Sequence, residues 1–193
     1  MGAIFQSLGR TVLAGVVLLI ILVLATGANV GASYAWWTFS MRWLHVLSGV
    51  MWIGLLWYFN FVQIPSMPKI PDEQKPAISK VIAPTALFWF RWAALATVVT
   101  GLLLAFMSGY IVSALGLQKP FTAIGIGMWL ALVMAFNVWF IIWPNQKKAL
   151  GIVTVEAAEK AKAGRMAMLA SRFNTMFSIP MLFCMVAQQN GGL

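Results

Sequence analysis

FTAIGIGMWLALVMAFNVWFIIW, residues 121–143, has no charged side chain and is long enough to cross a lipid bilayer as a helix. Four further apolar stretches lie at residues 11–27, 36–63, 83–115 and 170–188. Across the 193 residues, 62% are hydrophobic and 9% are charged, and a water-soluble fold of this size has too little interior for that composition. The apolar runs are continuous rather than alternating, which favours helices over the strands of a membrane barrel.

These runs predict an all-α, polytopic membrane helix bundle with about five transmembrane helices, a four-helix core plus one N-terminal helix. We expect residues 1–193 to form a single integral membrane domain. The run at 11–27 has a competing interpretation, because Arg10 before it and Ser33-Tyr34-Ala35 after it resemble a cleavable secretory signal. The length of the run and its distance from that site favour a membrane span.

Two connecting segments carry local signals. Residues 64–82 are rich in proline, which predicts an irregular, extended loop. The prolines of this loop are Pro65, Pro68, Pro71 and Pro76. Residues 154–165 are typical of a helix outside the membrane, with Thr154 as its N-cap and with Glu156 and Glu159 near its N-terminus.

The basic residues predict the orientation of the chain in the membrane. With five spans, most of them fall on the side of the N-terminus, and Arg42 and Lys119 fall on the other. The residues on the N-terminal side are Arg10, Lys69, Lys75, Lys80, Lys147, Lys148, Lys160, Lys162 and Arg165. The positive-inside rule therefore predicts an N-terminus in the cytoplasm and a C-terminus outside it, which for a bacterial inner membrane is the periplasm. The net charge of +9 is explained by this topology, so we expect no nucleic-acid partner.

Tryptophans occur where the predicted spans meet the membrane surface. Indole is enriched at membrane interfaces because its ring is apolar while its N–H needs a polar partner. The tryptophans expected at the cytoplasmic interface are Trp57, Trp89, Trp92, Trp139 and Trp143. Trp52 is placed at mid-depth instead, which makes it an unusual member of the second span.

The polar residues of the second span lie on one helical face. At about 100° per residue, they fall within a stripe about 80° wide, which is expected to face the interior of the bundle. The stripe comprises Arg42, His45, Gly49, Trp52, Leu56, Asn60 and Gln63. Ionisable groups inside a span are costly and are therefore candidates for function.

His45 is the one histidine of the chain and a candidate axial ligand of a haem iron. One turn away, Gly49 would leave room for a porphyrin, and Arg42 could pair with a propionate. Trp52 is included in the same candidate site because it shares this face. Two alternatives remain open, namely a histidine that only hydrogen-bonds between helices beside a snorkelling Arg42, and a role in proton transfer.

A six-coordinate haem needs a second axial ligand, and methionine is the available type. Met107, Met128, Met181 and Met185 lie near the expected depth of His45, and Met185 is the one we include in the candidate site. Methionine also fills gaps in ordinary helix packing.

The small residues Ala94, Thr97, Gly101, Ala105 and Ser108 form a stripe on the third span that predicts close helix packing. Asn137 and Asn174 are predicted to link helices by hydrogen bonds.

Other reaction classes lack their usual residues. The chain has a single cysteine, Cys184, and therefore no Cys-x-x-Cys pair for a metal or for covalent haem. Its four acidic residues are Asp72, Glu73, Glu156 and Glu159, all outside the predicted spans. This distribution argues against a transporter built on buried carboxylates and against a carboxylate-bridged metal site.

Two stretches carry a resemblance to a known family. RWLHVLSGVMWIGLLWYFNFVQIP at 42–65 and SRFNTMFSIPMLF at 171–183 resemble the membrane domain of the bacterial membrane-bound urate oxidase, or urate hydroxylase, family. The first stretch is also similar to small four-helix haem-binding membrane proteins of the protoporphyrinogen-oxidase type. Complete members of the urate oxidase family carry a C-terminal cytochrome c domain, whereas this sequence ends at Leu193 without a Cys-x-x-Cys-His motif. The resemblance thus implies a relative of the membrane domain rather than a complete urate oxidase.

Together these observations favour a membrane redox component that binds haem b through His45 and takes part in electron transfer. Its expected partners are the lipid bilayer and either other membrane-complex subunits or a periplasmic cytochrome c. The alternative is a cofactor-free accessory subunit of a larger respiratory or photosynthetic membrane complex. A stand-alone enzyme acting on urate or a porphyrin is a further possibility, and the sequence names no substrate.

Overall fold

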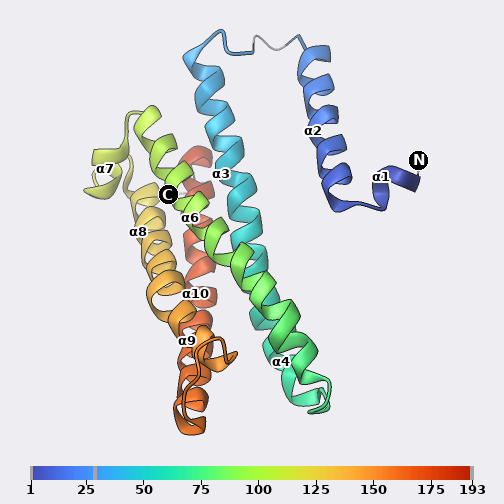
Figure 1. The fold of residues 1–193 in the computed structure, drawn as a ribbon. Helices are drawn as coiled ribbons and strands as arrows, with labels where there is room; N and C mark the ends of the chain where they lie inside the picture. The colour runs from blue at the N-terminus through green and yellow to red at the C-terminus, as the bar shows by residue number, and fades with distance from the viewer. Residues whose placement is uncertain (1, 28–29, 192–193) are drawn as a thin grey trace. The chain divides into compact units, whose positions relative to one another are not determined.

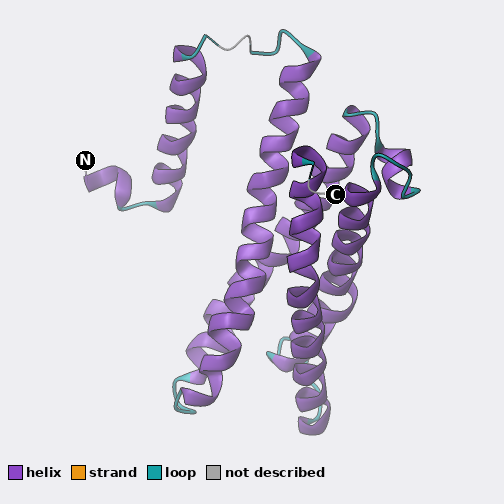
Figure 2. Ribbon diagram, turned by 180° about the vertical axis from the view of Figure 1, so that it is seen from behind, coloured by secondary structure: helices purple, strands orange, loops and turns teal. Residues whose placement is uncertain are grey.

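The structure is a computed structural model that describes residues 2–27 and 30–191. These residues form helices and no strand, and five helical segments are long and apolar enough to cross a membrane (Figure 1). The segments run Leu8–Ala25, Tyr34–Lys69, Lys75–Met107, Thr122–Ala149 and Ala157–Asn190. Figure 2 shows that only short loops join neighbouring helices of the described chain. The predicted all-α membrane fold is therefore confirmed.

The chain divides into two compact units, Met1–Ser40 and Met41–Leu193. The first unit contains α1 (Gly2–Phe5) and α2 (Leu8–Ala25), and no residue of α2 is buried. The division falls within α3 (Tyr34–Trp57). The second unit holds the remainder of α3 and all later helices, and the candidate site lies entirely within it.

Prolines set the local geometry of the long helices. Three segments are π-helical, and each ends two residues before a proline: η1 (Tyr58–Gln63), η3 (Ile78–Ile82) and η4 (Asn137–Ile142). The prolines that follow are Pro65, Pro84 and Pro144. A proline ring clashes with the carbonyl four residues earlier and has no N–H to donate, so a wider turn at this point lets the helix continue. The helices that continue are α4 (Ile64–Ser66), α6 (Ala83–Met107) and α9 (Trp143–Ala149).

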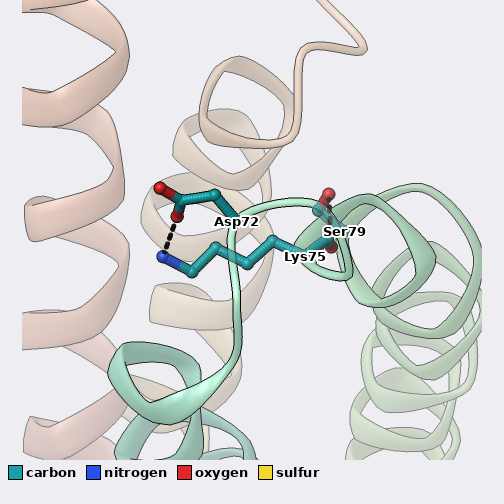
Figure 3. Close-up of polar contacts among 3 residues, drawn as sticks. All are labelled: Asp72, Lys75 and Ser79. Carbon is teal, nitrogen blue, oxygen red and sulfur yellow. Dashed lines mark hydrogen bonds and ion pairs between the residues drawn. The ribbon is translucent and has the colours of Figure 1, made fainter.

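The prediction of an irregular loop at residues 64–82 is wrong for most of this segment. It forms α4, η2 (Met67–Lys69), α5 (Lys75–Ala77) and η3. Pro65, Pro68 and Pro76 occupy the first positions of α4, η2 and α5, where proline is tolerated, and Pro71 lies in the turn between η2 and α5. At the turn itself, Lys75 Nζ donates to Asp72 Oδ1 at 2.6 Å and Ser79 Oγ donates to the Lys75 carbonyl at 3.1 Å (Figure 3). The hydrogen bond from Lys75 lowers the pKa of the exposed Asp72.

Two helix boundaries also differ from expectation. The third span ends at Met107 rather than near residue 115, because Gly109 adopts a φ of 75° and the chain turns into the separate α7 (Ile111–Leu115). The expected helix at 154–165 and the last span form one helix, α10 (Ala157–Asn190). Its N-cap position is Glu156 and not Thr154. The remaining long helix is α8 (Thr122–Phe136).

The core of the second unit lies where α3, α6, α8 and α10 meet. α10 packs along α8, η4 and α9, and small residues on its inner face allow this close approach. The buried small residues of α10 are Ala163, Ala167, Ala170, Ser171, Ser178, Cys184 and Ala187. The largest fully buried side chains are Trp52, Phe90, Leu56, Met134 and Val138. The labels α4 and α9 lie at one end of this bundle and α7 at the other (Figure 1).

Hydrogen bonds between polar side chains cross the core. Asn137 Nδ2 donates to Asn174 Oδ1 at 2.9 Å, and Asn174 Nδ2 donates to the Met134 carbonyl at 2.9 Å. The predicted interhelical role of these two asparagines is confirmed. From the second span, Asn60 Nδ2 donates to Ser171 Oγ at 2.7 Å, and Trp57 Nε1 donates to Ser178 Oγ at 3.0 Å. Trp52 and Leu56 of the polar stripe are fully buried, so this part of the stripe faces the bundle interior as predicted, whereas Arg42 at its outer end is exposed.

Replacing Asn174 with alanine should destabilise the bundle, because it removes two interhelical hydrogen bonds and leaves the buried Asn137 amide unpaired. We expect the free energy of unfolding to fall by about 1 kcal/mol, the usual size for such bonds in membranes. Thermal unfolding in detergent measures the effect. Asn190→Ala is the matched control, since the side chain of the exposed Asn190 donates to Val186 of its own helix rather than to another helix in the described structure. Equal loss of stability in both variants would contradict this role of Asn174.

Candidate functional site

A cavity of about 610 Å³ lies among α3, α6, α8 and α10. Its walls are predominantly apolar, with a few polar side chains from α3, α6, the residue before α7 and the end of α10. All the residues named from the sequence as the candidate site line it: Arg42, His45, Gly49, Trp52 and Met185. The structure therefore brings together residues from the second and fifth spans that are far apart in the chain.

His45 is held in a defined orientation by α6. Its Nδ1 lies 3.0 Å from the Thr97 carbonyl oxygen and 3.3 Å from Thr100 Oγ1. A carbonyl only accepts hydrogen bonds, so Nδ1 carries the proton and donates it, and Nε2 keeps its lone pair. Among the described residues, Nε2 has no hydrogen-bond partner. This is the arrangement in which a neutral imidazole can bind a metal through Nε2.

Gly101 makes the close packing of His45 possible. A Cβ atom at this position would lie 2.8 Å from His45 Cε1 and 3.1 Å from Nδ1, which is closer than carbon and ring atoms approach. At Gly49, by contrast, an added Cβ would meet Thr97 Cγ2 at an ordinary 3.9 Å. The crowded glycine of the site is therefore Gly101, whereas a side-chain carbon at Gly49 would make only an ordinary contact in the cavity wall.

Sequence reasoning interpreted Thr97 and Gly101 only as part of a small-residue packing stripe. Ala94, Thr97 and Ala105 are indeed buried, so that stripe does face the bundle. The structure adds a second role, because the carbonyl of Thr97 and the missing side chain of Gly101 position the imidazole. A backbone carbonyl has no sequence signal, but a glycine facing a histidine on the neighbouring span could have suggested the contact.

Methionines contribute to the wall of the cavity on α8 and α10. Met128, Met181 and Met185 line it, whereas Met107 is outside its lining. Met185 lies against α8, since its Cε would be 3.4 Å from a Cβ added at Gly127. Within the part of the chain that the structure describes, no three His, Cys, Asp or Glu residues cluster as metal ligands. A haem iron needs only one imidazole and one further axial ligand from the protein.

Trp52 lies at the buried end of the cavity, and Arg42 and Tyr110 lie at its other end, which is called the mouth below. Trp52 is fully buried, and its Nε1 has no hydrogen-bond partner among the described residues. At the other end of the lining are Arg42 and Tyr110, and Tyr110 stacks on Phe121 with the ring centroids 5.2 Å apart. Burial raises the pKa of Tyr110, while the nearby charge of Arg42 acts in the opposite direction. The mouth therefore combines a guanidinium cation with a neutral phenol.

Comparison with known protein families finds a match in the C-terminal part of the chain. Residues 120–191 match the family described as urate oxidase N-terminal, a region that includes α8, η4, α9 and α10 and less than half of the chain. The match contains the stretch 171–183 and excludes 42–65, so Met185 falls within it and His45 outside it. No curated protein and no solved structure matches the chain. The chain thus has a region similar to the urate oxidase N-terminal family.

Gly101→Ala should displace the imidazole of His45, because the new methyl group would overlap the ring. His45 is the sole histidine, so NMR of a sample labelled at histidine, with a tag other than polyhistidine, reports this ring alone. We expect the Nδ1 and Cε1 resonances to shift. Gly54→Ala is the matched control, since nothing lies within 4 Å of a Cβ at Gly54. Unchanged resonances in Gly101→Ala would refute the packing described here.

Proposed function

We propose that this protein is a membrane redox component that binds haem b through His45 and takes part in electron transfer. The observation that carries this proposal is the imidazole whose Nδ1–H bonds to the Thr97 carbonyl while Nε2 remains available beside an apolar cavity. Bound haem would supply one-electron chemistry.

The other residues of the cavity suit the same ligand. A cavity of about 610 Å³ with apolar walls is in the size range of cofactor sites and would exclude water from a porphyrin. Arg42, at the mouth, would pair with a propionate. Trp52 Nε1, which has no hydrogen-bond partner among the described residues, could donate to the ligand, and Gly49 lines the cavity without a side chain. Met185, which lines the same cavity from α10, would hold the haem iron together with His45, because its thioether can bind iron.

The proposed setting is the bacterial inner membrane, with the N-terminus in the cytoplasm and the C-terminus in the periplasm. The excess of basic residues at the end of the bundle that carries α4 and α9 supports this orientation. Electrons would pass to or from a periplasmic cytochrome c or another subunit of a membrane complex. The match at 120–191 and the resemblance at 42–65 support a relation to the membrane domain of the membrane-bound urate oxidase family.

The haem proposal is tested by a reduced-minus-oxidised absorbance spectrum of protein expressed with haem supplied. We expect a Soret band and a b-type α band in the wild type, and their loss in His45→Ala. Met185→Leu should retain haem but change its ligand-field bands, because one axial ligand is missing. Met176→Leu is the control, since Met176 is exposed on the same helix. A colourless wild type would reject haem and favour the cofactor-free accessory subunit.

The orientation is tested by labelling single cysteines in intact cells with a membrane-impermeant maleimide. The buried Cys184 is first replaced by alanine, which leaves a chain without cysteine. Lys119→Cys, at the end of the bundle near α8, should react in intact cells. Glu73→Cys, in the turn before α5, should react only after the membrane is permeabilised. The reverse pattern would place the C-terminus in the cytoplasm.

A further inference from the structure

Arg91 lies at the surface between α6 and α9, away from the cavity. Its guanidinium carbon is 3.7 Å from the centre of the Trp143 ring and 5.7 Å from that of Phe88. Lys147 Nζ is 5.7 Å from the centre of the same Trp143 ring. Two cations from different helices therefore approach one indole, which attracts both through its ring face.

Among the described residues, no carboxylate forms an ion pair with either of these two cations. The ion pairs among the described residues are Lys75–Asp72 and Lys148–Glu159, so Arg91 and Lys147 have no acidic partner there. Arg91 Nη1 is buried and has no hydrogen-bond acceptor in the part of the chain that the structure describes. A buried guanidinium nitrogen without an acceptor costs free energy, which a bound anion would recover.

The surrounding tryptophans indicate the depth of Arg91 in the membrane. Trp89 and Trp92, beside it on α6, are about half exposed, and Trp92 contacts Trp139 with the ring centroids 5.4 Å apart. Together with Trp143, these residues form an aromatic belt of the kind that lies at the headgroup level of a bilayer. The anion present at that level throughout a membrane is the phosphodiester of a phospholipid. Anionic phospholipids also carry the net negative charge that two adjacent cations favour.

We infer that Arg91, held on Trp143 and assisted by Lys147, binds the phosphate of an anionic phospholipid headgroup. The planar guanidinium can donate two parallel hydrogen bonds to phosphate oxygens, which an ammonium group cannot do. Stacking on Trp143 keeps the guanidinium in place, so little side-chain freedom is lost on binding. This site is separate from the cavity and independent of whether haem is bound.

The site is tested by titrating the purified full-length chain with phosphatidylglycerol and following bound lipid by native mass spectrometry. We expect wild-type protein to bind phosphatidylglycerol more tightly than phosphatidylcholine. Arg91→Gln should weaken phosphatidylglycerol binding about fivefold, the factor that one basic residue contributes at an anionic surface. Arg91→Lys should give an intermediate affinity, because the charge remains while the paired hydrogen bonds are lost.

Arg172→Gln is the matched control. It removes the same charge from an exposed position on α10, beside Ser171, for which the structure shows no ring contact. Unchanged binding in Arg172→Gln, with weakened binding in Arg91→Gln, supports a specific site. Equal effects of the two substitutions, or no effect of Arg91→Gln, would overturn it. Displacement of the lipid by millimolar inorganic phosphate would instead assign the site to a soluble anion and reject the lipid.

Thermal unfolding of each variant without added lipid separates binding from folding. The gain from phosphatidylglycerol is measured from each variant's own unfolding temperature in neutral detergent, because Arg91→Gln and Arg91→Lys also remove the stacking of the guanidinium on Trp143. Only the wild type should gain full stability from phosphatidylglycerol. A gain of the same size in Arg91→Gln would count against the proposal. His45→Ala should keep the lipid response, so failure of this site is distinguishable from failure of the haem proposal.

Discussion

The hydrogen bond from His45 Nδ1 to the Thr97 carbonyl is the interaction on which the candidate site depends. It joins α3 to α6, determines which ring nitrogen carries the proton, and leaves Nε2 available beside the cavity. The approach of the two helices at this point requires Gly101, because a side chain there would occupy the volume of the imidazole. Site geometry and helix packing are thus determined by the same few atoms.

A bilayer gives polar groups inside a bundle no water to bond with, so α3 can bury its polar face only where other helices supply partners. α10 supplies them at one level of the bundle, through Ser171 and Ser178. α6 supplies them at another, through Thr97 and Thr100. Between these levels, the buried N–H of Trp52 has no hydrogen-bond partner among the described residues and lies at the cavity.

Prolines in this chain either follow a π-helical segment or lie inside an unbroken α-helix. Pro65, Pro84 and Pro144 each follow a π-helical segment, so the long helices continue past them with a wider turn. Pro180 lies within α10, which is helical on both sides of it. The prolines of residues 64–82 are the reason that the sequence predicts a loop there, yet the segment is mostly helical. Proline is tolerated at early helical positions, and local sequence does not show which position it will occupy.

The sequence by itself determined the membrane class, the five spans and the inward face of the second span, because these follow from hydrophobicity and helical periodicity. The five residues that it proposed for the site, Arg42, His45, Gly49, Trp52 and Met185, all line one cavity, whereas Thr97, Gly101 and Tyr110 of the same lining were not among them. Only the tertiary structure decided that the Thr97 carbonyl orients His45, that Gly101 is the crowded glycine and that Arg91 stacks on Trp143. These contacts join residues of different helices, and their geometry depends on how the helices pack, which periodicity within one helix does not specify.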